Sequence, residues 1–482
     1  MSEFSARIER GEYQGSGDIK KIRETRNEVV LEQGFIQGMH TECILLVPEK
    51  YRENLLDGDK NMTVIDQIAQ LATFPGACGP LVGLPDMHAG TEFPVGLCGV
   101  FDAADSACVV IPEAIGPDIN CGVRMWGTNL LLSDFLPHRE EVLDAIAIEV
   151  PINEQETASK LCIRQILERG IEYLVQEGLA TEKDLLGTEC GGRIPVSSHA
   201  VIGQKPRAKG LLNLGTLGSG NHYLEFQTVS QIFNEADAKA LSLKQDSLCI
   251  SVHTGSRGLG HRAFTEFCND LRKESDKKVL SVPLSSPKGQ EYLSMVGAAA
   301  NYAYCNRVII GTKIEASLKK IIPGAKLHFI SDVPHNIAQV ETIGGGPKLV
   351  IRKGSTRVTS VADAQSALLY PSVGTPVSVG GSMSTGSYLI KGGKDSQKTC
   401  FTTCHGSGRI LRRREAKREI PLAETLAQLQ SSNVCIRTPN LSNLSEESEK
   451  AYKSIDEVVA FCEEAGISEK ICKLSPVAVL KG

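Results

Sequence analysis

The sequence predicts an α+β fold that forms one large domain over residues 1–482. Short β-branched runs bounded by Gly, Pro and Asp are typical of strands, and separate stretches repeat apolar residues with helical spacing. Glycine-rich loops occur along the whole chain, without an internal repeat or a long Pro/Ser linker. Because a rigid scaffold often brings binding loops together, we expect these distant loops to form one site.

The expected elements can be placed along the chain. Strand-like runs fall within residues 27–48 and 95–112, and mainly helical excursions are expected near residues 155–188 and 229–246. The last helical pattern stops at Gly466, a residue type that commonly ends helices. Helical spacing of apolar residues is clearest in residues 64–72, 140–150, 158–178 and 455–466.

Composition limits the function classes. The net charge is -5 and only 5% of the residues are aromatic, so a nucleic-acid partner would need a local basic patch and not a stacking surface. The fifteen cysteines contain no CxxC pair, and the charged N-terminus lacks the apolar core of a signal peptide. No apolar run approaches the roughly 18 residues of a membrane span. We expect a soluble protein of a reducing compartment, without a membrane partner and with mostly free, buried thiols.

Five loops place a His, Cys or Asp in a turn, often after an expected strand. A loop rich in glycine frees backbone N–H groups that can bind anions, although a tight turn is the simpler explanation for any single one. None of them matches the GxGxxG or GxxxxGK[ST] phosphate-binding patterns in context. The loops are LPDMHAG (84–90), GPDINCGVRM (116–125), GTLGSGNHYLEF (215–226), SVHTGSRGLGHR (251–262) and SDVPHNIAQVE (331–341).

Several of these loop residues form a candidate metal-binding set. Asp118 and Cys121 are three residues apart in one turn, and His222, His253 and His335 each follow an apolar or glycine-rich run. A thiolate with imidazoles and a carboxylate suits Mn, Fe, Co or Zn better than Mg or Ca, and a bridging thiolate can serve two ions. The alternative is that the histidines are structural hydrogen-bonding residues and Cys121 an ordinary buried thiol.

The segment FTTCHGSGRILRRREAK (401–417) holds a second candidate. His405 stands before a glycine-flanked serine, and six basic residues follow. If the segment is a helix, Arg409, Arg413 and Lys417 share one face, which suits phosphate. A solvated helical face is the alternative. The six are Arg409, Arg412, Arg413, Arg414, Lys417 and Arg418.

Taken together, these motifs resemble the RtcB family of 3′-phosphate/5′-hydroxyl RNA-splicing ligases. The residues that carry the resemblance are DINCGVR, GSGNH, VHTGSRGLG and CHGSGR, with RKGSTR, GSMSTGSYL and VAVLKG in the expected order, from about residue 27 to the last. The resemblance implies mixed sheets around a central metal and nucleotide cleft, with peripheral helices. It implies an enzyme that joins RNA 2′,3′-cyclic phosphate or 3′-phosphate ends to 5′-hydroxyl ends with GTP and two manganese(II) ions.

The resemblance also implies roles for individual residues. His405 would become linked to GMP and then pass it to RNA, giving an RNA(3′)pp(5′)G end. The metal ligands would be Asp118, Cys121, His222, His253 and His335. The nucleotide would be bound by Asn221, Tyr223, Glu225, Asn336, Ser387, Ser407, Gly408, Tyr452 and Lys481. The residues that would bind the RNA substrate are Asp86, Arg257, Arg409, Arg412 and Arg413.

Several positions depart from the family pattern. Thr91 and Glu92 stand where GYGF is expected, Ser407 replaces an alanine, and Arg412 with Arg413 replaces a Ser-Arg pair. These changes leave an alternative open, a divergent RNA-binding scaffold with weak or no ligase activity. A two-metal phosphohydrolase is a third hypothesis, but it leaves His405 without a role.

The resemblance further implies cellular partners. Split tRNA halves are the expected RNA, and an activating protein or a ligase complex is an expected protein partner. A cytoplasmic location, with the nucleus as a second one, fits this expectation.

Overall fold

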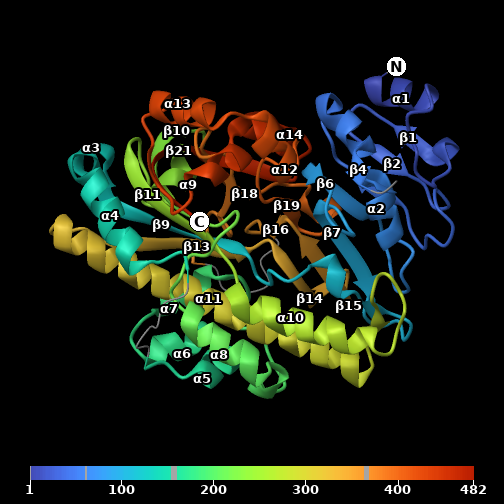
Figure 1. Cartoon of the computed structure of the whole chain (residues 1–482), viewed down its shortest axis with the longest axis horizontal. Helices are drawn as coiled ribbons and strands as arrows, with labels where there is room; N and C mark the ends of the chain where they lie inside the picture. The colour runs from blue at the N-terminus through green and yellow to red at the C-terminus, as the bar shows by residue number, and fades with distance from the viewer. Residues whose placement is uncertain (1, 60–61, 154–159, 363–368) are drawn as a thin grey trace.

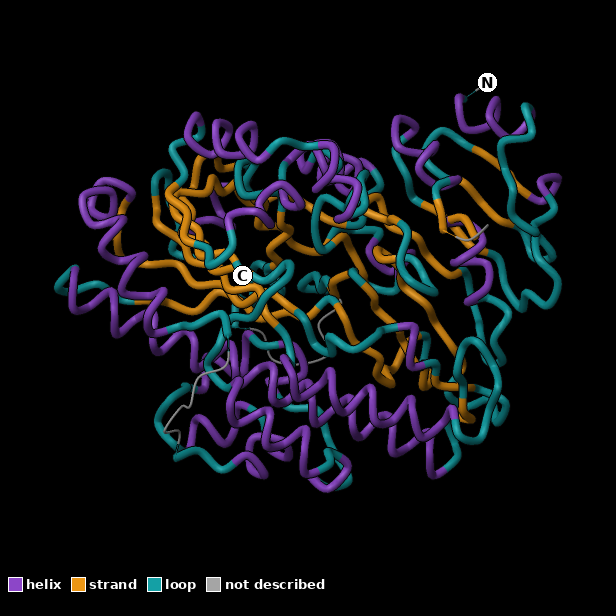
Figure 2. Tube along the Cα trace, viewed as in Figure 1, coloured by secondary structure: helices purple, strands orange, loops and turns teal. Residues whose placement is uncertain are grey.

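The computed structural model describes residues 2–59, 62–153, 160–362 and 369–482, and it contains two large β-sheets with helices packed outside them (Figures 1 and 2). The predicted α+β class is confirmed. The first sheet has the strand order β1-β2-β3-β6-β7-β15-β14. Its strands are β1 (Ile22–Glu24), β2 (Val29–Leu31), β3 (Cys43–Leu45), β6 (Leu81–His88), β7 (Val95–Asp102), β15 (Gly346–Lys353) and β14 (Asn336–Ile343).

The second sheet has the order β13-β9-β11-β10-β21-β18-β17, with β20 paired to β21. Its strands are β13 (Leu327–Pro334), β9 (Gly122–Leu131), β11 (Ser247–Thr254), β10 (Tyr223–Ile232), β21 (Ser468–Lys481), β18 (Ser387–Gly392), β17 (Val377–Gly380) and β20 (Cys435–Arg437). Strands far apart in the sequence are neighbours here, since β21 pairs with β10 and brings Lys481 opposite Tyr223. Three short pairs complete the strands: β4 (Gly58–Asp59) with β5 (Met62–Thr63), β8 (Val109–Val110) with β12 (Val282–Pro283), and β16 (Ser355–Arg357) with β19 (Thr402–Cys404).

The helices cover the sheets from two sides. Figure 1 shows α10 and α11 along one side, with α5, α6 and α8 outside them, and α12 to α14 on the other side. The helices are α1 (Glu3–Glu9), α2 (Val64–Leu71), α3 (Leu132–Phe135), α4 (Arg139–Glu149), α5 (Ile163–Arg169), α6 (Ile171–Gln176), α7 (Glu182–Gly187), α8 (Gln204–Asn213), α9 (Glu235–Ala240), α10 (Arg257–Arg272), α11 (Pro287–Ile321), α12 (Arg413–Glu419), α13 (Leu422–Ser431) and α14 (Ile455–Glu464). None of these described helices combines the length and apolar character that a membrane crossing requires.

Most of the expected elements are confirmed. The runs in residues 27–48 and 95–112 contain β2, β3, β7 and β8, and the four helical patterns correspond to α2, α4, α5 with α6, and α14. Residues 160–188 are mainly helical as predicted, while residues 155–159 lie outside the described residues. At the junction of α5 and α6, Gly170 has φ +53°, and a Cβ there would lie 2.2 Å from the carbonyl oxygen of Gly192. This turn requires glycine, because its positive φ is unfavourable for other residues and a side chain would have no room.

Three expectations need correction. The 229–246 excursion is only partly helical, because β10 continues to Ile232 and only α9 follows it. The 251–262 loop ends in α10, which begins at Arg257. Arg409 does not share a helix with Arg413, because α12 begins at Arg413. Arg409 instead lies in the preceding segment, where its guanidinium is held by the carbonyl oxygens of Leu411 and Glu446.

Candidate active site

Four neighbouring strands of the second sheet bring the predicted metal ligands together. Cys121 precedes β9, His222 precedes β10, His253 lies near the end of β11, and His335 joins β13 to β14. The register places Tyr223, the residue after His222, opposite His253, and His253 opposite Val123. Loops separated by up to about two hundred residues therefore meet at one edge of the sheet.

The ligand atoms form two overlapping groups. Those of Cys121, His253 and His335 all lie within 4.8 Å of one another, and so do those of Asp118, Cys121 and His222. The Cys121 Sγ lies 3.4 Å from His222 Nε2 and 3.2 Å from His253 Nε2. Cys121 belongs to both groups, so its sulfur is in the position that a ligand shared by two ions would occupy.

The chemistry of this donor set fits a divalent transition metal. The Nε2 atoms of His253 and His335 face each other at 3.1 Å. In a pair of neutral imidazoles at least one of these two nitrogens therefore carries a lone pair that can bind a metal. Burial, together with the neighbouring histidines, holds the pKa of both rings well below the usual range. Buried, neutral imidazoles beside a thiol and a carboxylate are the ligands that Mn, Fe, Co and Zn accept.

His405 lies beside this cluster and is oriented by a buried carboxylate. Its Nδ1 hydrogen-bonds to Asp86 Oδ2 at 2.8 Å, and its backbone N–H donates to the same oxygen at 3.1 Å. Its ring centroid is 4.8 Å from that of His335. Burial alone would raise the pKa of Asp86, but the hydrogen bond and the charge of His405 outweigh it and lower that pKa. A carboxylate at Nδ1 favours the tautomer in which Nε2 carries the free lone pair.

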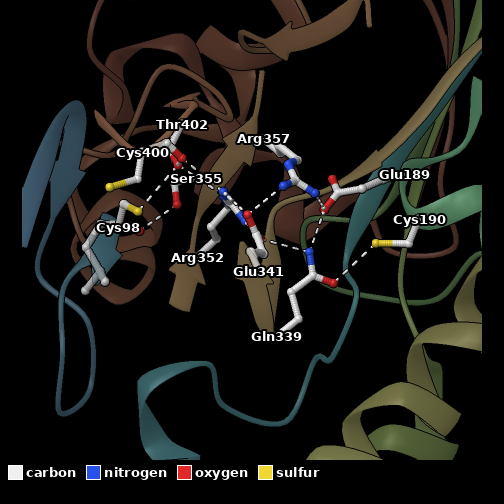
Figure 3. Close-up of polar contacts among 11 residues, drawn as sticks. Cys98, Glu189, Cys190, Gln339, Glu341, Arg352, Ser355, Arg357, Cys400 and Thr402 are labelled. Atoms are coloured by element: carbon white, nitrogen blue, oxygen red, sulfur yellow. Dashed lines mark hydrogen bonds and ion pairs between the residues drawn. The ribbon is translucent and has the colours of Figure 1, made fainter. Parts of the chain in front are cut away.

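A buried ionic network supports the strand that delivers His405 (Figure 3). Arg352 on β15 donates to Thr402 Oγ1 at 3.0 Å and to the carbonyl oxygen of Cys400 at 3.1 Å, and it pairs with Glu341. Arg357 pairs with the same glutamate at 2.6 Å. Because one carboxylate is shared by two guanidinium groups, β14, β15, β16 and β19 are fixed relative to one another.

A cavity of about 250 Å³ is lined by His405 and by two residues of the metal-capable cluster, His253 and His335. Its wall near the histidine is the Gly406–Gly408 turn, where Gly408 has φ +73° and a Cβ would lie 2.1 Å from the carbonyl oxygen of Asp86. Its far end is formed by Glu225, Glu447, Tyr452 and Lys481, while Asn221, which also lines the second cavity, and Tyr223 lie closer to the cluster. A second cavity of about 580 Å³ opens on the metal side and contains Asp118, Cys121, His222, Asn336, Lys353 and Arg413. His405 borders both cavities.

The far end of the first cavity is charged but shielded from water. Burial raises the pKa of Glu225 to about 8, although Lys481 acts in the opposite direction. Burial lowers the pKa of Lys481, whose Nζ donates to the carbonyl oxygen of Gly220 at 2.9 Å. Glu447 accepts from the hydroxyl of Tyr452 at 2.5 Å and pairs with Arg413 at 3.0 Å. This end therefore offers buried donors and acceptors for a flat polar group.

Comparison with known proteins decides the family. A model of the tRNA-splicing ligase RtcB family matches residues 67–482. The chain belongs to the RtcB family. Two similar proteins are RNA-splicing ligase RtcB homolog 1 of Entamoeba histolytica and RNA-splicing ligase RtcB homolog 2 of Entamoeba dispar. Each is 34% identical over 487 aligned residues, which cover 96% of this chain and 93% of the relative.

Membership of the RtcB family confirms the resemblance inferred from the loop motifs, and most of the motif residues meet in space. His405 and the five predicted ligands form one cluster. Asn336 lies on the metal side, where its Nδ2 donates to the carbonyl oxygen of Asp118 at 2.8 Å. The cavity beyond His405 is lined by Asn221, Tyr223, Glu225, Ser407, Gly408, Arg409, Arg413, Tyr452 and Lys481.

Four predicted RtcB site residues lie elsewhere. Asp86 is fully buried behind His405, so it is placed to orient that ring and not to meet RNA. Ser387 is buried and accepts from Gln227 Nε2 at 2.9 Å. Arg257 is held by Thr216 and by the carbonyl oxygen of Ile152 at 3.2 Å, and it borders neither cavity. Arg412 precedes α12 and is exposed outside both cavities.

Two further side chains of this RtcB site lie outside the sequence motifs. Glu447 is buried between Tyr452, Arg413 and Lys481, although the segment SEESEKAY carries no signal that separates it from its acidic neighbours. Arg307 on α11 reaches the ligand loops, donating to the carbonyl oxygens of Asn120 at 2.9 Å and Thr254 at 2.8 Å. Long-range contacts of this kind have no local pattern in the sequence.

Proposed function

We propose that this protein is a GTP- and manganese-dependent ligase that joins RNA 2′,3′-cyclic phosphate or 3′-phosphate ends to 5′-hydroxyl ends. The observation that carries the proposal is the position of His405. Its ring borders both the cavity that contains all five predicted ligands and the cavity that contains Lys481, next to His253 and His335, which also line both. A nucleophile for a nucleotide phosphate has to meet both a cation site and a nucleoside site.

His405 acts as the nucleophile in this proposal. Asp86 holds Nδ1, so that Nε2 presents its lone pair to the α-phosphate of GTP. An N–P bond forms at Nε2 and the bond to pyrophosphate breaks, which leaves GMP on the histidine. When bound, two manganese ions held by Asp118, Cys121, His222, His253 and His335 would polarise the phosphate oxygens and offset their negative charge. The narrow turn at Gly406 and Gly408 leaves the backbone close to the reacting group.

The nucleoside would occupy the cavity beyond the histidine. Glu225 would accept from the N–H groups of guanine, Lys481 would bond its acceptor edge, and the ring of Tyr452 would pack beside it. Two observations support this placement. Glu225, Tyr452 and Lys481 line the same cavity. Arg409 fixes the Tyr452 ring, because its guanidinium lies 4.7 Å from the ring centroid and donates to the hydroxyl at 2.7 Å. Ser387 would act indirectly, through Gln227, which donates to Glu225 at 3.0 Å.

The RNA ends would meet on the metal side. The RNA 3′-phosphate attacks the GMP phosphorus, the bond to His405 breaks, and an RNA(3′)pp(5′)G end results. The 5′-hydroxyl of the second RNA then attacks the 3′-phosphorus and GMP leaves. Arg413 borders both cavities, while Arg412, Arg414 and Arg418 lie outside on or before α12, so backbone phosphates can follow this surface without sequence readout.

The proposal includes the RNA substrates, the cellular location and the protein partner. Split tRNA halves are the substrates that we propose, in the cytoplasm and also the nucleus, with an activating protein or a ligase complex as a partner.

The test is guanylylation of the purified protein with manganese and GTP labelled at the α-phosphate. We expect protein-bound label that is labile to acid, stable to alkali and absent in His405→Ala. His261→Ala, which removes an exposed histidine of α10, is the matched control and should label normally. Label that persists on His405→Ala contradicts the nucleophile assignment. No label on the native protein, with manganese bound, favours the RNA-binding scaffold.

A further inference from the structure

One histidine of the cavity wall has no role in the proposed reaction. His88 is the last residue of β6, two positions after Asp86. Its Nδ1 lies 2.9 Å from the carbonyl oxygen of Asp86. A carbonyl oxygen only accepts hydrogen bonds, so Nδ1 carries the proton of this contact.

This contact determines what the other ring nitrogen offers. With Nδ1 protonated, the neutral imidazole has a lone pair and no proton at Nε2. Burial lowers the pKa of His88 to about 4, so the ring is neutral at physiological pH. Across the described residues, no group hydrogen-bonds to Nε2. His88 thus brings an unused hydrogen-bond acceptor to the cavity that it lines.

The position of His88 relative to His405 indicates which part of a ligand it meets. Both rings are held by Asp86, His405 by its carboxylate and His88 by its carbonyl oxygen. Gly408 packs against the same carbonyl group. The cavity that His88 borders is lined by Tyr452 and Lys481 as well as by His253 and His335, and His88 is absent from the lining of the cavity that contains Asp118. His88 shares the first of these cavities with the residues assigned to the nucleoside and is held by the same Asp86 as His405, which puts it near the first chemical unit beyond a phosphate on Nε2. In a ribonucleotide that unit is the ribose.

We propose that His88 Nε2 accepts a hydrogen bond from a ribose hydroxyl of the nucleotide, which makes His88 a specificity residue for ribonucleotides. This inference rests on the proposed function, because it needs a nucleotide at His405. The two carboxylates of this cavity already have partners in the proposal, since Glu225 is assigned to the guanine and Glu447 accepts from Tyr452, so a ribose hydroxyl needs a further acceptor. A deoxynucleotide lacks the donor and leaves Nε2 unpaired.

Two substitutions test the roles of His88 Nδ1 and Nε2 independently. In His88→Asn the side-chain amide can still donate to the Asp86 carbonyl oxygen, but nothing replaces Nε2. In His88→Gln the longer side chain can place its amide oxygen near the former Nε2. The experiment measures labelling rates at subsaturating nucleotide with GTP, 2′-deoxy-GTP and 3′-deoxy-GTP, each labelled at the α-phosphate. His261→Asn is the matched control, and thermal melting and manganese content report the integrity of each variant.

The native protein should use GTP about two- to tenfold faster than one of the two deoxy analogues, which identifies the hydroxyl. In His88→Asn the labelling rate with GTP should fall by that same factor, while the rate with that deoxy analogue should stay unchanged. The preference for GTP then disappears. His88→Gln should recover part of it. Equal losses with all three nucleotides would assign His88 a purely structural role, and a native protein without preference would also overturn the inference.

The experiment also distinguishes a failure of the proposed function from a failure of the ribose assignment. If the native protein is labelled by none of the nucleotides, the proposed function is wrong and the inference fails with it. Sealing of preformed RNA(3′)pp(5′)G to a 5′-hydroxyl RNA is measured in parallel. A loss in His88→Asn that is confined to sealing would place His88 at the RNA 5′-hydroxyl and would overturn its assignment to the ribose.

Discussion

The carboxylate of Asp86 and the imidazole of His405, 319 residues apart in sequence, are joined by a hydrogen bond of 2.8 Å. Asp86 is fully buried, and its second oxygen, Oδ1, has no hydrogen-bond partner among the described residues. A carboxylate that is withdrawn from solvent in this way can hold the ring and its tautomer but cannot reach a substrate. Because the carboxylate fixes the proton on Nδ1, the His405 ring presents the Nε2 lone pair that an attack on phosphorus needs.

Replacement of Asp86 by Asn tests this pair directly. An amide group can donate to Nδ1, which would move the ring proton to Nε2 and block the nucleophile. We expect guanylylation to fall by about 10²- to 10⁴-fold, by analogy with the loss of the tautomer-fixing aspartate in serine proteases. Labelling rates report the loss, while manganese content should stay unchanged. A variant that labels at the native rate would show that Asp86 does not orient His405.

Cys121 should be needed for metal loading because its sulfur belongs to both ligand groups. Cys121→Ala should lower the bound manganese per protein, as measured by elemental analysis after gel filtration. Cys472→Ala is a matched control, since Cys472 is also buried but lies on β21 among apolar residues. Equal manganese content in the native protein and Cys121→Ala would refute the ligand assignment.

Glu225 predicts a pH dependence of nucleotide binding. Burial raises the pKa of this carboxyl to about 8, so near pH 7 the proton occupies the oxygens that guanine needs as acceptors. The apparent KM for GTP should therefore fall as the pH rises from 6.5 to 8.5, by at most about tenfold per pH unit. Labelling at saturating manganese measures this dependence. Glu225→Gln, which cannot ionise, should show a higher and flatter KM, and an unchanged slope in that variant would exclude Glu225.

Lys481 should matter for the nucleotide more than for the metal. Its Nζ is bound by the carbonyl oxygen of Gly220 and lies 3.8 Å from Glu447, at the far end of the cavity. Deleting Lys481 and Gly482 should raise the KM for GTP at least several-fold while manganese binding is largely retained. Parallel losses of both would instead indicate misfolding, because Gly482 also donates its backbone N–H to the carbonyl oxygen of His222.

Arg307 should be a stability determinant of the metal-binding loops. Its buried guanidinium pairs with Asp332 at 2.8 Å and donates to the carbonyl oxygens next to Cys121 and at Thr254. Arg307→Met should cost about 3–5 kcal/mol in the free energy of unfolding, since breaking a buried ion pair leaves uncompensated polar groups. Urea unfolding measures the effect. Arg193→Met, which removes an exposed pair with Glu172, should change the stability by less than about 1 kcal/mol.

Local patterns in the sequence predicted many of the elements. Helices α4 and α14 each have one buried side, so their apolar residues recur with helical spacing. Helix α11 lacks this signal because its central turns are buried on nearly all sides. The 229–246 segment was predicted as more helical than it is, because the end of β10 is fixed by its pairing with β21 and not by local propensity.

The local motifs are sufficient to name the reactive groups of the site. His405, Cys121 and the three histidines were identifiable because their glycine-rich motifs are local and combine into a specific set. How these groups are oriented toward one another depends on the folded chain. It placed Asp86 behind His405, put Glu447 against Tyr452, and withdrew Ser387 and Arg257 from the cavities. These placements could not be predicted from local patterns, because orientation, burial and charge pairing arise from contacts between residues that are far apart in the chain.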